Sequence, residues 1–189
     1  PFFLYYVPGG THAPHHPTQE WVDKIHAMHL FDDGYEKLRE RIFANQKKLG
    51  VIPQDAQMSP WPTDILKLWD QTTDDEKKLF IRQVEIFAAY AAYSDYETGR
   101  VIQSFQDLGK LDNTLIFYCA DNGASGEGSP NGSVNENKFF NGYPDELSEN
   151  MQYLDTLGSP ETYNHYPTGW AAAFSTPFPM FKRYAQYSG

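Results

Sequence analysis

Residues Thr73 to Asn122 read TDDEKKLFIRQVEIFAAYAAYSDYETGRVIQSFQDLGKLDNTLIFYCADN and carry the strongest secondary-structure signals in the chain. Thr73 and Glu76 have the spacing of a capping box, in which each side chain satisfies a free backbone N–H group at a helix start. Apolar residues then recur at helical spacing until Leu108, and Gly109 is a natural helix end. The pattern predicts one helix of roughly 50 Å, followed by a buried strand over residues 114–120.

A second apolar run lies upstream of this helix. Residues 2–7 read FFLYYV and stop at Pro8-Gly9-Gly10. Continuous apolarity is typical of a strand covered on both faces, as in a parallel sheet. A strand, a helical crossover and a strand predict an α/β fold, mostly a parallel sheet with flanking helices and a right-handed connection.

The remaining sequence divides into two helical stretches and one long loop. Residues 18–30 and 33–49 have helical patterns, and Gly50 is a plausible stop for the second. Residues 123–169 are dense in Gly, Asn, Pro, Ser and Tyr, which predicts a loop-rich C-terminal third. We therefore expect residues 1–189 to form a single domain.

The charge balance excludes several classes of partner. The chain has 25 acidic and 15 basic residues, a net charge of −10, which argues against nucleic acid or an anionic membrane surface as the main partner. No apolar run reaches the length of a membrane span. A single cysteine, Cys119, cannot form an internal disulfide or a multi-cysteine metal site, and its strand context predicts a buried thiol.

Polar residues of chemical interest follow both predicted strands. The first strand leads to His12, His15 and His16, and the second leads to Asp121-Asn122. In open α/β sheets ligands bind beyond the carboxyl ends of the strands, so these groups are expected at one edge. Asp121 and Asn122 offer hard oxygen ligands for Ca²⁺ or Mg²⁺, although Asp-Asn-Gly is also a common turn.

The histidines leave several roles open, and familiar motifs are absent. They could serve as metal ligands, acid or base groups, or cations that bind an anion. The sequence has no glycine-rich phosphate loop, nucleophile elbow or dinucleotide fingerprint. The residues alone predict a site for a divalent cation and an anionic substrate.

The motifs, taken in order, resemble the sulfatase family, specifically its arylsulfatase-like branch with an alkaline-phosphatase-like fold. The resemblance is carried by PFFLY with THAPHHP (1–5 and 11–17), LGVIP (49–53), YSDYETGR (93–100), LDNTLI (111–116), DNGAS (121–125), YNHYP (163–167) and GWA (169–171). It extends over most of the chain.

The resemblance implies roles for four residues. Asp121 and Asn122 match the pair that ligates an active-site Ca²⁺, with Mg²⁺ as the second choice. His15 matches the histidine that hydrogen-bonds the sulfate ester near the scissile bond. Lys182 matches a late lysine that contacts the sulfate oxygens. His12 and His16 have no counterpart role.

The resemblance also implies features that these residues lack. Sulfatases use a formylglycine made in a Cys/Ser-x-Pro-x-Arg motif, and no such motif occurs here. The early pair of metal-binding aspartates is also absent. We therefore expect an internal fragment of a sulfatase with the formylglycine upstream, inactive on its own, and periplasmic or secreted by family analogy.

The sequence motifs are compatible with three functions. The first is an arylsulfatase-type sulfuric ester hydrolase that acts on a small-molecule or saccharide sulfate ester. The second is a phosphatase or phosphodiesterase of the same superfold, with a Ser or Thr nucleophile. The third is a non-catalytic protein that binds sulfated ligands through its aromatic residues and Lys182.

Overall fold

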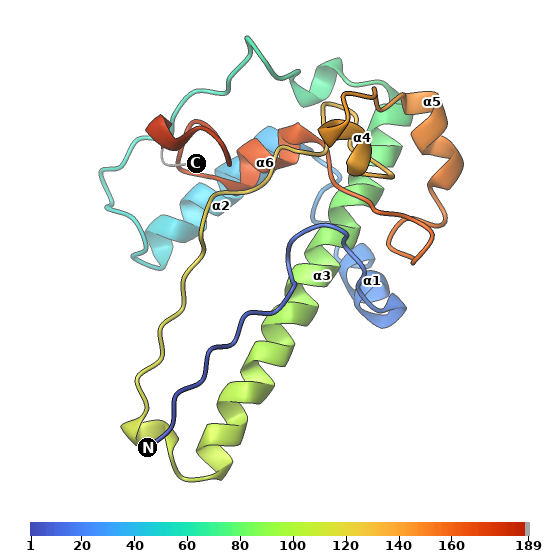
Figure 1. The fold of residues 1–189 in the computed structure, drawn as a ribbon. Helices are drawn as coiled ribbons and strands as arrows, with labels where there is room; N and C mark the ends of the chain where they lie inside the picture. Colours follow the sequence, from blue (N-terminus) through green and yellow to red (C-terminus); the bar gives the residue numbers. More distant parts are fainter. Residues whose placement is uncertain (188–189) are drawn as a thin grey trace.

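The computed structural model describes residues 1–187, and its longest element is the helix α3, which spans most of the molecule (Figure 1). The helices are α1 (Gln19–His26), α2 (Tyr35–Lys48), α3 (Asp74–Asp107), α4 (Asn137–Phe140), α5 (Leu147–Asn150) and α6 (Thr168–Phe174). Short 3-10 turns occupy Trp69–Gln71, Leu111–Asn113, Met151–Tyr153 and Ala185–Tyr187.

The two ends of α3 confirm the predicted helix. The backbone N–H of Glu76 donates to Thr73 Oγ1 at 3.2 Å, and the N–H of Thr73 donates to the Glu76 carboxylate at 2.7 Å. At the other end Gly109 has a φ of +63°, and the N–H of Lys110 donates to the carbonyl of Phe105 at 2.9 Å. This left-handed glycine closes the last turn and ends the helix.

The two earlier helices also form, with one shorter than predicted. Helix α2 ends at a second left-handed glycine, Gly50, as the sequence indicates. Helix α1 ends at His26 instead of residue 30, because the chain leaves the helix in a turn that gives His29 a φ of +50°. Helix α1 packs on α3, and α2 packs on α6.

The predicted parallel sheet is wrong for the described residues. The structure is 44% helical and 2% strand and contains no sheet, which contradicts a mostly parallel alkaline-phosphatase-like architecture. Bridges occur only as two isolated pairs within residues 1–187, Ser133 with His165 and Asn135 with Tyr163. No backbone hydrogen bond in this part of the chain joins residues 2–7 to residues 114–120.

Both apolar runs are extended, but neither is buried. Figure 1 draws them as extended stretches without arrows. Phe3 is 90% exposed and Phe117 is 85% exposed, and Cys119 is exposed as well, which corrects the prediction of a buried thiol. Apolarity favours burial, but a strand forms only where a neighbour pairs with its backbone.

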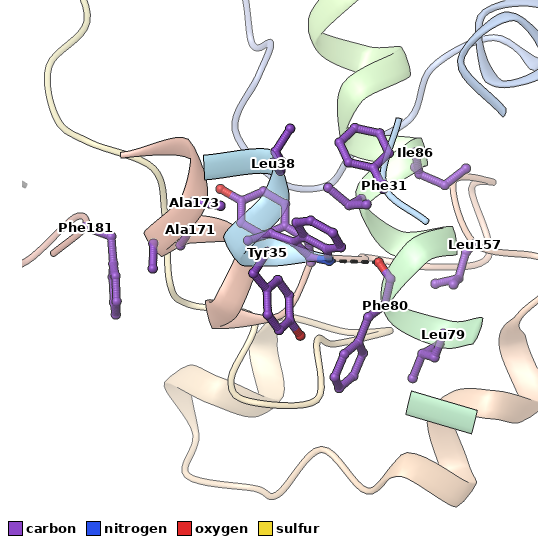
Figure 2. Packing of buried hydrophobic residues seen from close by; sticks show 14 of the residues in the cluster. Phe31, Tyr35, Leu38, Leu79, Phe80, Ile86, Leu157, Ala171, Ala173 and Phe181 are labelled. Carbon is purple, nitrogen blue, oxygen red and sulfur yellow. Dashed lines mark hydrogen bonds between the residues drawn. The ribbon is translucent and has the colours of Figure 1, made fainter. Parts of the chain in front are cut away.

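The buried core lies where α2, α3 and α6 meet, as Figure 2 shows. Trp170 of α6 is fully buried, and its ring contacts Tyr35 with centroids 4.6 Å apart. Its indole Nε1–H donates to the carbonyl of Phe80 on α3 at 3.0 Å, the dashed line in Figure 2. This cluster fixes α6, and with it the chain segment that follows.

No helix within residues 1–187 combines the length and the apolarity that a bilayer crossing requires.

Candidate functional site

A cavity of about 590 Å³ lies beside Asp121 and Asn122. Residues 120–124 form one border, and residues 174–178 at the end of α6, together with Ala185, form the other. Ser175 lines the cavity, and its buried hydroxyl has no hydrogen-bond partner within residues 1–187. The cavity is therefore large enough for a small ligand and offers it polar groups.

Asp121 and Asn122 supply oxygen atoms to this cavity. The amide nitrogen of Asn122 donates to the carbonyl of Gly123 at 2.8 Å, which orients the side chain and leaves its oxygen Oδ1 as an acceptor. No side chain of the described residues is hydrogen-bonded to the Asp121 carboxylate. A carboxylate and an amide oxygen in adjacent positions are the donors that Ca²⁺ prefers.

The number of such ligands is smaller than a calcium ion needs. Ca²⁺ takes six to eight oxygen ligands. In residues 1–187 no group of three or more His, Cys, Asp or Glu side chains could hold a metal ion. The donor chemistry of Asp121 and Asn122 fits the ion, but a Ca²⁺ held there would need its other ligands from solvent, substrate or further residues.

Lys182 is joined to the Asp121 segment through its backbone. Its N–H donates to the carbonyl of Ala124, which lines the cavity, at 2.9 Å. Its ammonium group Nζ donates to the carboxylate oxygen Oε2 of Glu127, also at 2.9 Å. The ammonium is thus held by an ion pair with Glu127, and Lys182 does not itself line the cavity.

Glu127 is a buried carboxylate that binds several donors, and sequence reasoning did not identify it. Its Oε2 also accepts from the hydroxyl of Ser125 at 2.9 Å, and its Oε1 lies 3.3 Å from Nε of Arg183. Burial opposes its charged form, but the hydrogen bonds and positive charges outweigh burial and hold the pKa of Glu127 below its ordinary value. Glu127 therefore remains a carboxylate.

His15 lies in an aromatic cage away from the cavity border. It is 1% exposed, and its ring contacts Phe87, Tyr166 and His165 with centroids 5.0, 5.6 and 5.2 Å away. Burial, reinforced by the neighbouring histidines, lowers the pKa of His15 well below its ordinary value. The imidazole is neutral at pH 7, so it can exchange one hydrogen bond but does not act as a fixed cation.

His165 is a second buried histidine that was not singled out from the sequence. Its Nδ1 lies 2.8 Å from the carbonyl oxygen of Tyr166 and donates a hydrogen bond to it, which fixes the tautomer. Burial lowers the pKa of His165 to about 4. Its backbone pairs with Ser133 through two hydrogen bonds of 2.9 Å, so residues 123–169 are pinned at this point.

Three further polar residues lie outside the cavity lining: His12 and His16 of the 11–17 loop, and the buried Glu136. Nε2 of His16 lies 2.7 Å from the carbonyl of Thr162 and fastens the loop there, and Nδ1 of His12 lies 2.8 Å from the carbonyl of Ala13. Glu136 is 1% exposed, and neither of its carboxylate oxygens has a hydrogen-bond partner within residues 1–187. Burial raises the pKa of Glu136.

The structure thus brings together some of the predicted site residues and separates others. Asp121 and Asn122 line one cavity, the Lys182 backbone is hydrogen-bonded to Ala124 of its lining, and the Lys182 side chain binds Glu127. His15 is packed against His165 instead. No sequence periodicity marks Glu127 or Glu136, because both lie in the aperiodic stretch 123–169.

Comparison with known proteins identifies the family. A sulfatase family model matches residues 1–178, a range that stops before Lys182. An uncharacterized sulfatase of Schizosaccharomyces pombe is 32% identical over 190 positions, which cover 99% of this chain and 32% of that protein. An arylsulfatase of Klebsiella aerogenes is 23% identical over 94% of this chain and 36% of its own length.

The chain is much shorter than the relatives that it matches. It spans about a third of the length of the curated relatives that it matches. The family model covers nearly the whole chain, from the predicted strand at residues 2–7 past the Asp121-Asn122 pair. By this match the chain belongs to the sulfatase family.

Proposed function

We propose that the whole protein is an arylsulfatase-type sulfuric ester hydrolase and that this chain supplies part of its active site. One observation carries the proposal. Asp121 and Asn122 line a cavity, and the segment with Lys182 is joined to that lining by the hydrogen bond between the Lys182 N–H and the Ala124 carbonyl. Hard oxygen ligands and an ammonium group therefore lie on neighbouring segments.

The chemistry of the reaction explains why such groups are needed. A sulfate ester carries negative charge on oxygens that must be stabilised as the bond from sulfur to the leaving oxygen breaks. Lys182 supplies a fixed positive charge for those oxygens. Asp121 and Asn122 would hold a Ca²⁺ ion, which supplies a further positive charge as a Lewis acid when bound. An acidic protein needs such a local positive site to bind an anionic substrate.

His15 and the nucleophile complete the proposal. The neutral imidazole of His15 has a buried Nδ1 with no hydrogen-bond partner in the described residues, so it can bond to an ester oxygen that reaches it. A hydrated formylglycine supplies the nucleophile in this class of reaction, and it would have to lie outside residues 1–189. The sequence motif for it is absent from residues 1–189.

Replacing Asp121 tests the metal assignment. In the whole protein, Asp121→Ala is expected to weaken calcium binding about a hundredfold or more, because even outer-shell changes at metal sites cost 10–100-fold. Calorimetric titration with Ca²⁺ alone measures the affinity, and Mg²⁺ serves as competitor. Asp112→Ala, in the turn at Leu111–Asn113, is the matched control. Unchanged calcium affinity in Asp121→Ala contradicts the assignment.

Replacing Lys182 tests the ester-binding role. Lys182→Ala is expected to lower kcat/KM for 4-nitrophenyl sulfate about a hundredfold, the usual cost of removing one oxyanion-stabilising donor. Lys182→Arg should restore part of the loss, because it keeps the positive charge. Lys138→Ala removes a lysine whose ammonium lies 2.7 Å from Glu149 and should leave the rate unchanged. Equal rates for Lys182→Ala and the control would argue against the role.

A further inference from the structure

Arg183, the residue after Lys182, is held by the Glu127 carboxylate that also binds Lys182. Its Nε lies 3.3 Å from Oε1 of Glu127, while Lys182 binds the other oxygen, Oε2. Its guanidinium carbon lies 5.0 Å from the centre of the Phe139 ring, a distance typical of cation–π contacts. Two cations on consecutive residues thus share one buried carboxylate.

The backbone at Arg183 is strained. Its φ is +85°, in the left-handed region that residues with a side chain rarely adopt. Such conformations cost free energy and persist where the surroundings impose them, often at functional sites. Here Glu127 and Phe139 together hold the side chain, so the strain fixes where the guanidinium lies.

The guanidinium retains donors for a ligand. Arginine has five N–H donors in a planar fork that suits sulfate and carboxylate groups. The ion pair with Glu127 is made through Nε, and the side chain is 55% exposed. The segment also stays close to the cavity on both sides of Arg183, because Lys182 is hydrogen-bonded to Ala124 of the lining and Ala185 lines the cavity itself.

The charge balance leaves a net positive charge here. Lys182 and Arg183 contribute two positive charges, and the carboxylate of Glu127 contributes one negative charge. Glu136 is the other carboxyl group that interacts with Lys182, and burial favours its neutral form. A sulfate ester held by Lys182 balances this net charge, and within residues 1–187 the Arg183 donors other than Nε remain free to hydrogen-bond a second negative group on the same ligand.

We propose that Arg183 is a second anion-binding residue beside Lys182, and that the preferred ligands are sulfate esters with another negative group. This proposal rests on the proposed function, from which it takes the binding of a sulfate ester. It adds that the preferred esters carry a second negative group. Glu127 acts in it as a positioning residue, because it holds both cations by opposite oxygens.

A binding experiment tests the proposal independently of hydrolysis. The probes are benzenesulfonate and benzene-1,3-disulfonate, titrated calorimetrically into the whole protein. We expect the disulfonate to bind more tightly, and Arg183→Gln to reduce the ratio of the two dissociation constants about tenfold, the worth of one charge-assisted hydrogen bond. An unchanged ratio overturns the proposal, and so does the absence of any preference in the unsubstituted protein.

Three further variants separate binding from folding. Arg183→Gly removes the guanidinium and relieves the positive φ, so it should fold at least as well and still lose the preference. Arg183→Lys should keep part of the preference. Arg100→Gln removes an exposed arginine on α3 that is paired with Glu97, and it should change nothing. A preference retained in Arg183→Gly contradicts the proposal.

Kinetics distinguish failure of this proposal from failure of the proposed function. The substrates are 4-nitrophenyl sulfate and its ring-carboxylated analogue. In Arg183→Gln the KM of the carboxylated ester should rise about tenfold with kcat retained, while Lys182→Ala lowers kcat/KM for both. If the unsubstituted protein hydrolyses neither ester, the proposed function fails, and the sulfonate ratio still decides the role of Arg183.

Discussion

Lowering the pH from 7 to 4 is expected to reduce the free energy of unfolding by about 3 kcal/mol through His165 alone. The reason is that burial lowers the pKa of His165 to about 4 in the folded chain, against 6.5 for an ordinary histidine. The unfolded state therefore binds a proton that the folded state does not bind. His15, with a pKa also lowered by burial, adds a further loss in the same direction.

The sign follows from which state takes up protons. For a histidine with a depressed pKa in the folded state, the full contribution is present above pH 6.5 and is lost as the pH falls towards the folded value. Burial raises the pKa values of Glu136 and Asp145, which favours the folded state at low pH and opposes the histidines. A comparison between variants is therefore needed to isolate His165.

Urea unfolding at several pH values makes this comparison. His165→Asn keeps an N–H donor for the Tyr166 carbonyl but has no titrating group, so its stability should fall less steeply below pH 6.5. The control is His29→Asn, because His29 is an exposed histidine on a turn and asparagine tolerates its positive φ. The same slope in His165→Asn as in the unsubstituted chain would show that His165 titrates normally.

Trp170→Ala is expected to lower the free energy of unfolding by about 4 kcal/mol, in the range for large aromatic residues removed from a core. Trp170 is fully buried, and its ring lies 5.5 Å from both Phe31 and Trp69, measured between centroids. The substitution leaves a cavity between α2, α3 and α6. It also removes the indole N–H bond to Phe80, which joins α6 to α3.

The urea unfolding midpoint measures this loss. Trp170→Phe should be intermediate, because it keeps a ring but loses the hydrogen bond. Phe140→Ala removes an aromatic side chain that is 57% exposed, and it should cost less than about 1 kcal/mol. A loss below about 2 kcal/mol in Trp170→Ala would mean that the core closes around the missing ring.

The helices were predictable because their signals are local. The capping box at Thr73 and Glu76 and the glycines at 50 and 109 act within one or two turns of backbone. The end of α1 was missed by four residues, since nothing in residues 27–30 marks the turn through His29. Helix ends without a capping residue depend on the packing of the following chain.

The site was only partly predictable, because its contacts join residues that lie far apart in the sequence. The ordered motifs indicated the sulfatase family, and the family model confirms that resemblance. The pairing of Lys182 with Glu127 joins residues that are 55 positions apart, and no local pattern encodes it. Burial of His15 against His165 likewise depends on how the 11–17 loop meets residues 162–166.

Local sequence patterns were enough to predict the long helix, its two ends, the oxygen ligands available at Asp121-Asn122 and the family. Tertiary structure alone decided whether apolar residues are buried, which is why Phe3 and Phe117 are exposed although both lie in strand-like runs. It also decided that Glu127 holds two cations and that the two buried histidines are neutral. Short-range backbone preferences are encoded residue by residue, whereas burial, ion pairing and pKa values depend on which distant segments come into contact.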